Sequence, residues 1–337
     1  MQYINDSLEG KKILITGGAG FIGSNLALYF QKHHKARVVV FDSFRSEKTF
    51  SNRHFKSLGH FKNLLDFKGE VIAGDITNKA DLERLESYNF DYIFHQAAIS
   101  DTTVMDQEAV LRANVNAYKD LLDLCVRQGA KMIYASSAGV YGNSPAPNSI
   151  GSGEIPENVY GFSKLMMDNL TQKYLQQYPN LSIVGLRYFN VYGNKEVYKG
   201  KTASMILQLG LQALEQKRVR LFKMGEQKRD FVYIEDVIQA NIKAMESKKS
   251  GVYNVGSGNA RSFNDIIACL KMDLGEFEVE YFDNPYAFFQ THTEANITLT
   301  KEFLGYTPRF SLEVGVKNYL PEIKAIHANG LWNAIVG

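Results

Sequence analysis

A serine, a tyrosine and a lysine have the residue types and spacing for proton transfer. Tyr160 and Lys164 stand four positions apart in a helix-like segment, so on a helix they share one face. A free phenol has a pKa of about 10, and a neighbouring ammonium lowers that value by favouring the phenolate. Ser137 follows an apolar run and can hold the oxygen that loses its proton. Together these residues predict an acid–base device that interconverts an alcohol and a ketone.

A tyrosine and a lysine at this spacing are by themselves more often a surface feature, but a glycine pattern upstream supports the prediction. The strand-like run 12–16 leads directly into Gly17, Gly20 and Gly23, and a helical stretch follows. Glycines at this spacing permit a tight turn and the close approach of a pyrophosphate, and the new helix points its amides at the phosphates. The pattern therefore predicts a dinucleotide site, with further contacts from Phe21 and Ile22.

The residues after the second strand bear on which dinucleotide binds. Asp42 can accept hydrogen bonds from a ribose, which favours NAD, whereas Arg45, Lys48 and Arg53 can neutralise a 2′-phosphate, which favours NADP. Neither signal decides the question, and a solvated charged loop explains any one of these cations equally well. We expect tightly bound NADP, with NAD as the alternative. Asp75 and Ile76 are candidate contacts after the third strand, although an acid there is more often a cap.

The surrounding chain predicts the elements that position these residues. Short apolar or β-branched runs at 12–16, 37–41, 70–73, 92–95 and 131–135 alternate with helix-length stretches such as 25–32 and 110–128. Further strand-like runs lie at 183–187, 252–255 and 278–281. This alternation predicts an α/β fold with a doubly wound parallel sheet of the Rossmann type and a smaller mixed α/β substrate domain.

The domain boundary has no obvious linker. No repeat, low-complexity tract or Pro/Gly-rich segment divides the chain, so the two halves should pack directly on each other. We expect a dinucleotide-binding domain over residues 1–191 and a substrate-binding domain over 192–337. Residues 229–248 are expected to return to the first domain.

Composition narrows the possible partners and compartment. The 337 residues carry a net charge of +2, which does not favour nucleic acid or a membrane surface. Cys125 and Cys269 lie far apart in apolar stretches, as expected of reduced core thiols. No apolar run is long enough to cross a bilayer, and the amino-terminal segment is unlike a secretory signal. We therefore expect a cytoplasmic protein with no metal site.

The order of the glycine pattern, Ser137, Tyr160 and Lys164 resembles the extended short-chain dehydrogenases that act on sugar nucleotides, over essentially the whole chain. Ala138 and Gly139 stand where dehydrating members usually carry an acidic pair, so dehydration is not expected. The segments most similar to the ADP-glyceromanno-heptose 6-epimerase family are 95–103, 158–164, 187–193, 198–204, 228–233 and 292–295.

This resemblance implies a reaction. ADP-heptose would be oxidised at C6 to a ketone and reduced again from the opposite face, in lipopolysaccharide heptose synthesis. Because C6 lies outside the ring, rotation about one bond presents the other face, and a second acid–base group becomes useful. By resemblance Tyr160 serves one configuration and Lys199 the other. Lys199 could instead be a solvated loop residue or a phosphate contact. The resemblance also implies a homo-oligomer.

The resemblance further implies two sets of binding residues. The cofactor set adds Gln96, Ala97, Ala98 and Asn114 to Tyr160 and Lys164. The substrate set is Ser100, Thr102, Thr103, Ser137, Asn190, Lys199, Ser204, Arg229 and Phe289. Thr102 and Thr103 could equally cap the following helix, and Arg229 could pair with Asp230. Phe289 replaces a family tyrosine and would weaken one substrate contact.

Two other hypotheses compete with the heptose assignment. One is a UDP-sugar 4-epimerase or another NAD(P)-dependent nucleotide-sugar oxidoreductase. The Ser/Thr cluster at 100–103 and Lys199 argue against a galactose 4-epimerase. The other is a cofactor-sensing protein without catalysis. Such proteins typically lose the tyrosine or the lysine, and both are present here together with Ser137.

Overall fold

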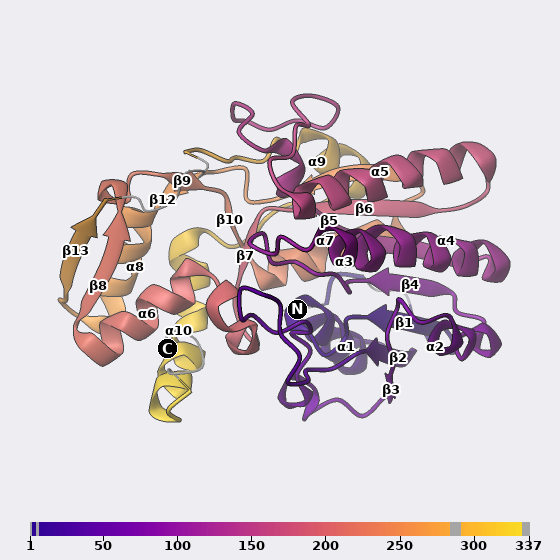
Figure 1. Cartoon of the computed structure of the whole chain (residues 1–337), viewed down its shortest axis with the longest axis horizontal. Helices are drawn as coiled ribbons and strands as arrows, with labels where there is room; N and C mark the ends of the chain where they lie inside the picture. Colours follow the sequence, from indigo (N-terminus) through magenta and orange to yellow (C-terminus); the bar gives the residue numbers. More distant parts are fainter. Residues whose placement is uncertain (1, 5–6, 284–290, 332–337) are drawn as a thin grey trace.

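The computed structural model describes residues 2–4, 7–283 and 291–331 and contains a seven-stranded parallel sheet (Figure 1). The strand order is β11-β6-β5-β4-β1-β2-β3. The strands are β1 (Lys12–Thr16), β2 (Arg37–Asp42), β3 (Glu70–Ala73), β4 (Tyr92–His95), β5 (Lys131–Ser137), β6 (Ile183–Tyr188) and β11 (Gly251–Val255). The predicted doubly wound α/β fold is confirmed.

The central strands are apolar on both faces because helices cover both. In β1, Ile13 and Ile15 belong to one core cluster and Leu14 to the other. The first cluster includes residues of α1 (Phe21–His33) and α7 (Ile234–Glu246), which pack on each other. The second includes residues of α4 (Ala117–Gln128) and α5 (Val159–Gln177). Burial on both faces is characteristic of a parallel sheet.

The helical stretch predicted over 110–128 is not one uninterrupted α-helix. The chain forms α3 (Gln107–Leu111), a π-helical turn (Arg112–Asn116) and then α4. Single π-turns inside helices often occur at functional sites. This one contains the fully buried Asn114, whose side chain faces the loop after β4.

The second half of the chain builds a smaller α/β unit, on the left in Figure 1. Three two-stranded pairs occur there or lead into it: β7 (Asn190–Tyr192) with β10 (Phe231–Tyr233), β8 (Arg218–Phe222) with β13 (Glu278–Phe282), and β9 (Lys228–Arg229) with β12 (Arg261–Ser262). The helices α6 (Met205–Gln216), α8 (Phe263–Leu274) and α10 (Leu312–Ala328) pack on one another.

The chain then returns to the large sheet. Helix α7 packs against β5 and β6, and β11 completes one edge of the sheet by pairing with β6 in parallel. Helix α9 (Thr298–Leu304) packs on both β11 and α7. Across the described ranges, no helix is both long and apolar enough to span a bilayer. No cluster of three metal-binding side chains occurs in the same ranges.

A buried ion pair joins β5, β6 and α5. The guanidinium of Arg187, 2% exposed, donates to the Asp168 carboxylate, with Nε–Oδ2 and Nη2–Oδ2 distances of 2.9 and 2.8 Å. Asp168 also accepts hydrogen bonds from the Tyr134 hydroxyl at 2.7 Å and from Ser136 at 3.0 Å. These contacts fix the end of β5 relative to α5, the two elements that carry Ser137 and Tyr160.

Replacing Arg187 should therefore cost far more stability than replacing a surface arginine. Arg187→Met leaves the Asp168 carboxylate buried without its cation, which lowers the free energy of unfolding by about 3–5 kcal/mol. The matched control is Arg37→Met, because Arg37 pairs with Glu70 at the surface, with side chains 58% and 36% exposed. There the loss is about 0–1 kcal/mol. Urea unfolding measures both, and equal losses would contradict the assigned role of the buried pair.

Candidate active site

The three residues predicted for proton transfer lie together where β5 ends and α5 begins. Asn158 caps α5 by accepting a hydrogen bond from Gly161 N at 2.8 Å, which places Tyr160 in the first turn and Lys164 one turn later. The Lys164 ammonium donates to the Ala135 carbonyl at 2.7 Å and lies 5.8 Å from the centre of the Tyr160 ring. Ser137, at the end of β5, lies close enough to Tyr160 to affect its pKa.

Burial dominates the electrostatics of these residues. It lowers the pKa of Lys164 to about 8, although the nearby Asp168 carboxylate raises it. Burial also raises the pKa of Tyr160, and the nearby Ser137 hydroxyl offsets part of that rise. In the protein alone, burial therefore outweighs the lowering expected from Lys164, and the lowering by Lys164 together with an oxidised nicotinamide stays a prediction.

The glycine turn between β1 and α1 leaves no room for side chains. A Cβ on Gly17 would lie 2.6 Å from Ala97 N, and Gly17 has a φ of +68° that glycine adopts readily. A Cβ on Gly23 would lie 2.2 Å from the Gly17 carbonyl oxygen. Helix α1 begins after Gly20 with no side-chain cap, so its first amides are available to an anion. Phe21 and Ile22 follow within this first turn, and the cradle fits a dinucleotide pyrophosphate.

Asp42 holds the glycine turn against the end of β2. Its carboxylate accepts hydrogen bonds from Ala19 N at 2.9 Å and Phe44 N at 2.8 Å, and it is 5% exposed. Burial raises the pKa of this carboxyl. These two bonds already explain why the carboxylate is buried here. The ribose contact expected of Asp42 therefore stays a prediction.

The other residues predicted to contact the adenosine half of the dinucleotide differ in their surroundings. Arg45 donates a hydrogen bond to the Tyr198 carbonyl and lies 4.6 Å from the centre of the Phe55 ring, while its Nε is buried without a partner. Lys48 is exposed. Asp75 accepts hydrogen bonds from the amide and hydroxyl of Thr77 at 2.8 and 2.9 Å, and the next residue, Ile76, is buried.

Asn114 fixes the loop that follows β4. Its carboxamide accepts a hydrogen bond from Ile99 N at 2.8 Å and donates to the Ile99 carbonyl and to Ser163 Oγ, both at 2.9 Å. At the start of the same loop, Gln96 N donates to the Thr16 carbonyl at 3.0 Å. Ala97 and Ala98 are thereby held beside the glycine turn, as the close approach of Ala97 to Gly17 also shows.

Ser100, Thr102 and Thr103 are exposed at the end of this loop. The Thr103 hydroxyl donates to Asp101 at 2.7 Å and accepts a hydrogen bond from Asn52 at 2.9 Å, and His54 Nδ1 lies 2.5 Å from the other Asp101 oxygen. The cap of α3 is Asp106, which accepts a hydrogen bond from Ala109 N. The alternative that Thr102 or Thr103 caps this helix is therefore wrong.

Sequence reasoning missed Asp101, Asn52 and His54 as supports of this loop. Asp101 is 8% exposed, and its hydrogen bonds from Thr103, His54 and Asn52 lower its pKa against the opposing effect of burial. The available signal was the long segment between β2 and β3, residues 43–69. It supplies both Asn52 and His54.

Lys199 reaches the dinucleotide turn from a distant part of the sequence. Its ammonium lies 5.4 Å from the centre of the Phe21 ring, and Phe21 is the first residue of α1. Burial lowers the pKa of Lys199, and the charge of Glu196 opposes the shift. Glu196 is fully buried and accepts hydrogen bonds from Ser204 N at 2.8 Å and Ser204 Oγ at 2.6 Å. Ser204 also caps α6, so its hydroxyl already has structural partners.

Asn190 and Arg229 lie where the smaller unit meets the sheet. Asn190 is exposed and its N–H donates to the Asp230 carbonyl at 3.0 Å. Burial lowers the pKa of Arg229 to about 10, and its guanidinium donates to the Lys228 carbonyl at 2.8 Å. The Asp230 carboxylate instead accepts hydrogen bonds from Ser257, Gly258 and Ala295. The alternative that Arg229 and Asp230 simply pair is therefore wrong. Phe289 lies outside the described residues.

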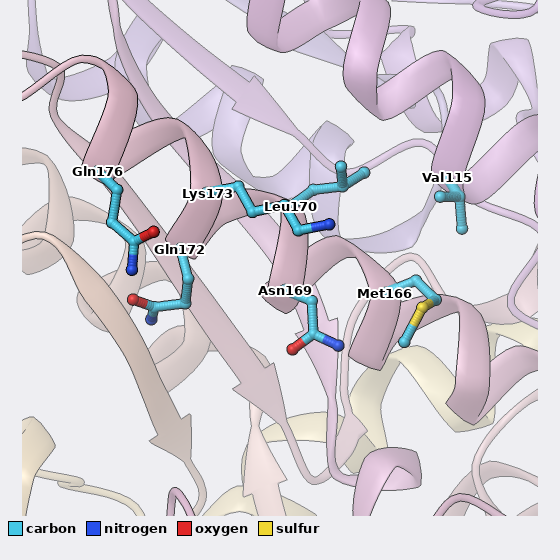
Figure 2. A pocket seen from close by; sticks show the side chains of 7 residues that line it. All are labelled: Val115, Met166, Asn169, Leu170, Gln172, Lys173 and Gln176. Atoms are coloured by element: carbon cyan, nitrogen blue, oxygen red, sulfur yellow. The ribbon is translucent and has the colours of Figure 1, made fainter.

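A hollow of about 450 Å³ lies elsewhere, on the outer face of α5 (Figure 2). Its lining residues are Val115, Met166, Asn169, Leu170, Gln172, Lys173 and Gln176. None of the residues predicted for proton transfer or dinucleotide binding lines it. The candidate active site is instead defined by the ends of β1, β4 and β5 and the start of α1.

The parallel sheet, the glycine turn and the Ser–Tyr–Lys arrangement together define a protein of the short-chain dehydrogenase type. Residues 13–256 match the model of the NAD dependent epimerase/dehydratase family, and the chain belongs to this family. It is similar to the ADP-L-glycero-D-manno-heptose-6-epimerase of Helicobacter pylori, with 59% identity, coverage of 97% of this chain and 100% of that one, and a TM-score of 0.90.

Two 4-epimerase structures are also similar. UDP-glucuronic acid 4-epimerase from Bacillus cereus, in complex with UDP-glucuronic acid and NAD, has 31% identity and a TM-score of 0.79, over 94% of this chain and 99% of that one. UDP-glucose 4-epimerase from Thermotoga maritima has 28% identity and a TM-score of 0.82, over 93% and 99%. The nearly complete coverage shows that these proteins share the whole architecture.

The Asp168 carboxylate should set the alkaline limit of activity through Lys164. Asp168→Asn removes the charge that raises the Lys164 pKa and leaves Arg187 with Glu154 as its remaining anionic partner. The ammonium is then lost at a lower pH, so the alkaline limb of the kcat/KM profile moves to lower pH. Asp123→Asn, which removes a surface partner of Lys119, is the control. Superimposable alkaline limbs for all three proteins would contradict this coupling.

Proposed function

We propose that the chain is an ADP-glyceromanno-heptose 6-epimerase that inverts C6 by transient oxidation to a ketone. The observation that carries the proposal is that two candidate acid–base groups lie where the parallel strands of the sheet end, one after β5 and one at the start of α1, which follows β1. Tyr160 with Ser137 and Lys164 lies at the end of β5, and Lys199 packs on the first residue of α1. The Helicobacter pylori epimerase, similar over the whole chain, supports the choice of sugar.

The first acid–base group handles one configuration of the alcohol. Ser137 holds the substrate oxygen, and the Tyr160 phenolate removes its proton. Lys164 supplies a buried positive charge beside the phenol. When bound, an oxidised nicotinamide dinucleotide supplies the two-electron oxidation and its reversal, and its positive charge favours the phenolate. That second cation matters because burial alone raises the pKa of Tyr160.

Lys199 handles the opposite configuration. Inversion at an exocyclic carbon turns the oxygen away from Tyr160, so the returning proton must come from another group. The lowered pKa of Lys199 suits this task, since an ammonium with a lower pKa gives up a proton more readily. Burial is the main cause of the lowered pKa, so it is the position of Lys199 in the fold that makes its ammonium a stronger acid.

The remaining residues bind the two nucleotides. The glycine turn and the loop from Gln96 to Ala98 would hold the pyrophosphate and the nicotinamide half of the dinucleotide. Arg45, with an unpartnered Nε, and Lys48 favour NADP over NAD by offering charge to a 2′-phosphate. Because the reaction is redox-neutral, we infer that this cofactor stays bound through the cycle.

The sugar nucleotide is proposed to lie between the sheet and the smaller unit. Arg229 offers a forked cation for its diphosphate, beside Asn190. Ser100, Thr102 and Thr103 expose hydroxyls that can bond to the heptose. Ser204 supports Glu196 and α6 and would contribute indirectly. We also infer that the enzyme works in the cytoplasm as a homo-oligomer, on the precursor of lipopolysaccharide heptose.

The substrate assignment is tested by nuclear magnetic resonance of the sugar after incubation with ADP-heptose and, separately, UDP-glucose. We expect inversion at C6 of ADP-heptose with retention of the nucleotide. Inversion at C4 of UDP-glucose with no change in ADP-heptose would establish the 4-epimerase alternative instead. The dinucleotide released from the purified protein identifies NADP or NAD in the same preparation.

Removing the Tyr160 hydroxyl should stop turnover without unfolding the protein. Tyr160→Phe is nearly isosteric and removes the proton-transfer group, so kcat falls by about 10²- to 10⁴-fold. Tyr178→Phe, at the far end of α5, is the control and should turn over normally. Thermal unfolding checks that both variants fold, and a Tyr160→Phe enzyme with normal kcat would refute the assigned role.

Lys199→Met should impair epimerisation much more than dinucleotide retention. Methionine keeps an apolar chain of similar length against Phe21 but cannot carry a proton, and kcat is expected to fall by about 10²-fold or more. The control is Lys201→Met, an exposed lysine in the same segment. The kcat and the amount of copurified dinucleotide are measured together. Loss of dinucleotide with unimpaired chemistry would rule out a second acid–base role.

A further inference from the structure

The segment after β2, residues 43–60, spans from the dinucleotide turn to the segment that carries Lys199. Its end is held on the turn, because His60 N donates to the Ala19 carbonyl at 3.0 Å and Asn63 Nδ2 donates to the same oxygen at 3.1 Å. Its start is closed onto this end by the hydrogen bond from Arg45 N to the Gly59 carbonyl at 2.7 Å. The segment is thus anchored to the turn at His60.

From this anchor, the His60 ring makes a close contact with Tyr198. The two ring centres are 3.8 Å apart and the planes differ by 4°, a parallel stack. The Arg45 guanidinium donates to the Tyr198 carbonyl, so both the ring and the backbone of Tyr198 are held. Phe61 stacks near His60 at 4.9 Å. Tyr198 is therefore clamped directly before Lys199.

The position of the Lys199 ammonium depends on the position of the Lys199 backbone. Its ammonium makes no hydrogen bond to any residue in the described ranges and instead lies over the Phe21 ring. Its backbone N–H donates to the Glu196 carbonyl, and its carbonyl accepts a hydrogen bond from Thr202, both at 2.9 Å. A lysine has a flexible stem with several rotatable bonds, so a shift of this backbone would move the ammonium readily.

We propose that His60 is a positioning residue that holds Lys199 at the dinucleotide turn by stacking on Tyr198, with Arg45 as the second half of the clamp. This inference rests on the proposed acid–base role of Lys199. It links the place of Lys199 to the glycine turn through two short contacts, Ala19 to His60 and His60 to Tyr198. The role is indirect, because His60 acts through Tyr198 rather than on the substrate.

The test compares His60→Ala, which removes the ring, with His60→Phe, which keeps a planar ring for the stack. A displacement of a reacting group by about 1 Å can cost about 10²-fold in rate, so we expect kcat for His60→Ala to fall by about 10- to 100-fold. KM and the copurified dinucleotide should stay near those of the unaltered enzyme. His60→Phe should recover most of kcat. His327→Ala, which loses only a surface contact with Glu215, is the control.

A second measurement does not depend on activity. Amine labelling followed by mass spectrometry reports how accessible Lys199 is, with Lys164 as an internal reference in the same molecule. We expect labelling of Lys199, but not of Lys164, to rise in His60→Ala and to return to its original level in His60→Phe. The labelling is measured on the full-length protein with its copurified dinucleotide.

The outcomes separate this clamp from the proposed function. Normal kcat and unchanged labelling in His60→Ala would refute the clamp. Loss of the dinucleotide or of the fold in His60→Ala and His60→Phe alike would also overturn it, since the imidazole would then be needed for folding or dinucleotide binding rather than for the position of Lys199. Equal defects in both variants without that loss would exclude the ring stack as the cause. A fully active Lys199→Met would refute the two-group chemistry, whatever the labelling shows.

Discussion

The hydrogen bond from the Lys164 ammonium to the Ala135 carbonyl places a positive charge inside the protein, where charges are costly. Lys164 is 1% exposed, and burial lowers its pKa to about 8 against the opposing charge of Asp168. The fold must therefore supply compensation close by. It does so through Asp168, which Arg187 and two hydroxyls from β5 hold in place. The buried network thus stabilises the charge of Lys164 and also fixes β5 relative to α5.

A second constraint is the close approach of backbones at the glycine turn. Gly17 lies against Ala97, so the turn after β1 and the loop after β4 fit together only without side chains. Asp42 closes the other side by accepting the Ala19 amide. The turn is therefore fixed from both sides before any ligand binds, and its free helical amides face the place of the phosphates. Such preorganisation reduces the ordering that binding requires.

The sequence was sufficient for the sheet and for the proton-transfer group. The strands of the large sheet were predicted because each contains an apolar or β-branched run, which is buried in every strand except the edge strand β3. The segment that forms α5 was predicted to be helical, which put Tyr160 and Lys164 on one face. The strands β7, β9, β10 and β12 were missed, since elements of two or three residues carry no periodicity. The π-turn at Asn114 was missed for a similar reason. The proton-transfer roles themselves stay predictions until the variants are measured.

The electrostatics could not be read from the sequence. The spacing of Tyr160 and Lys164 predicts that the cation lowers the phenol pKa, but it cannot reveal that the ammonium turns to the Ala135 carbonyl or how deeply the phenol is buried. Likewise, nothing in the sequence around His60 or Asp101 indicates contact with Tyr198 or His54. These pairs are brought together by the segment after β2, whose path depends on tertiary packing.

The comparison with 4-epimerases shows where specificity can reside. Those proteins share the sheet and the overall architecture with this chain, so the fold alone cannot select the carbon that is inverted. A ring carbon and an exocyclic carbon differ in how the substrate must turn between the two half-reactions. For an exocyclic carbon, rotation moves the oxygen away from the tyrosine, and a second proton donor is then needed. The segment from Glu196 to Ser204 brings Lys199, the donor proposed above, to the start of α1. We infer that this segment, together with the loop that carries Ser100, Thr102 and Thr103, makes a redox site shared by the family suitable for epimerisation at an exocyclic carbon.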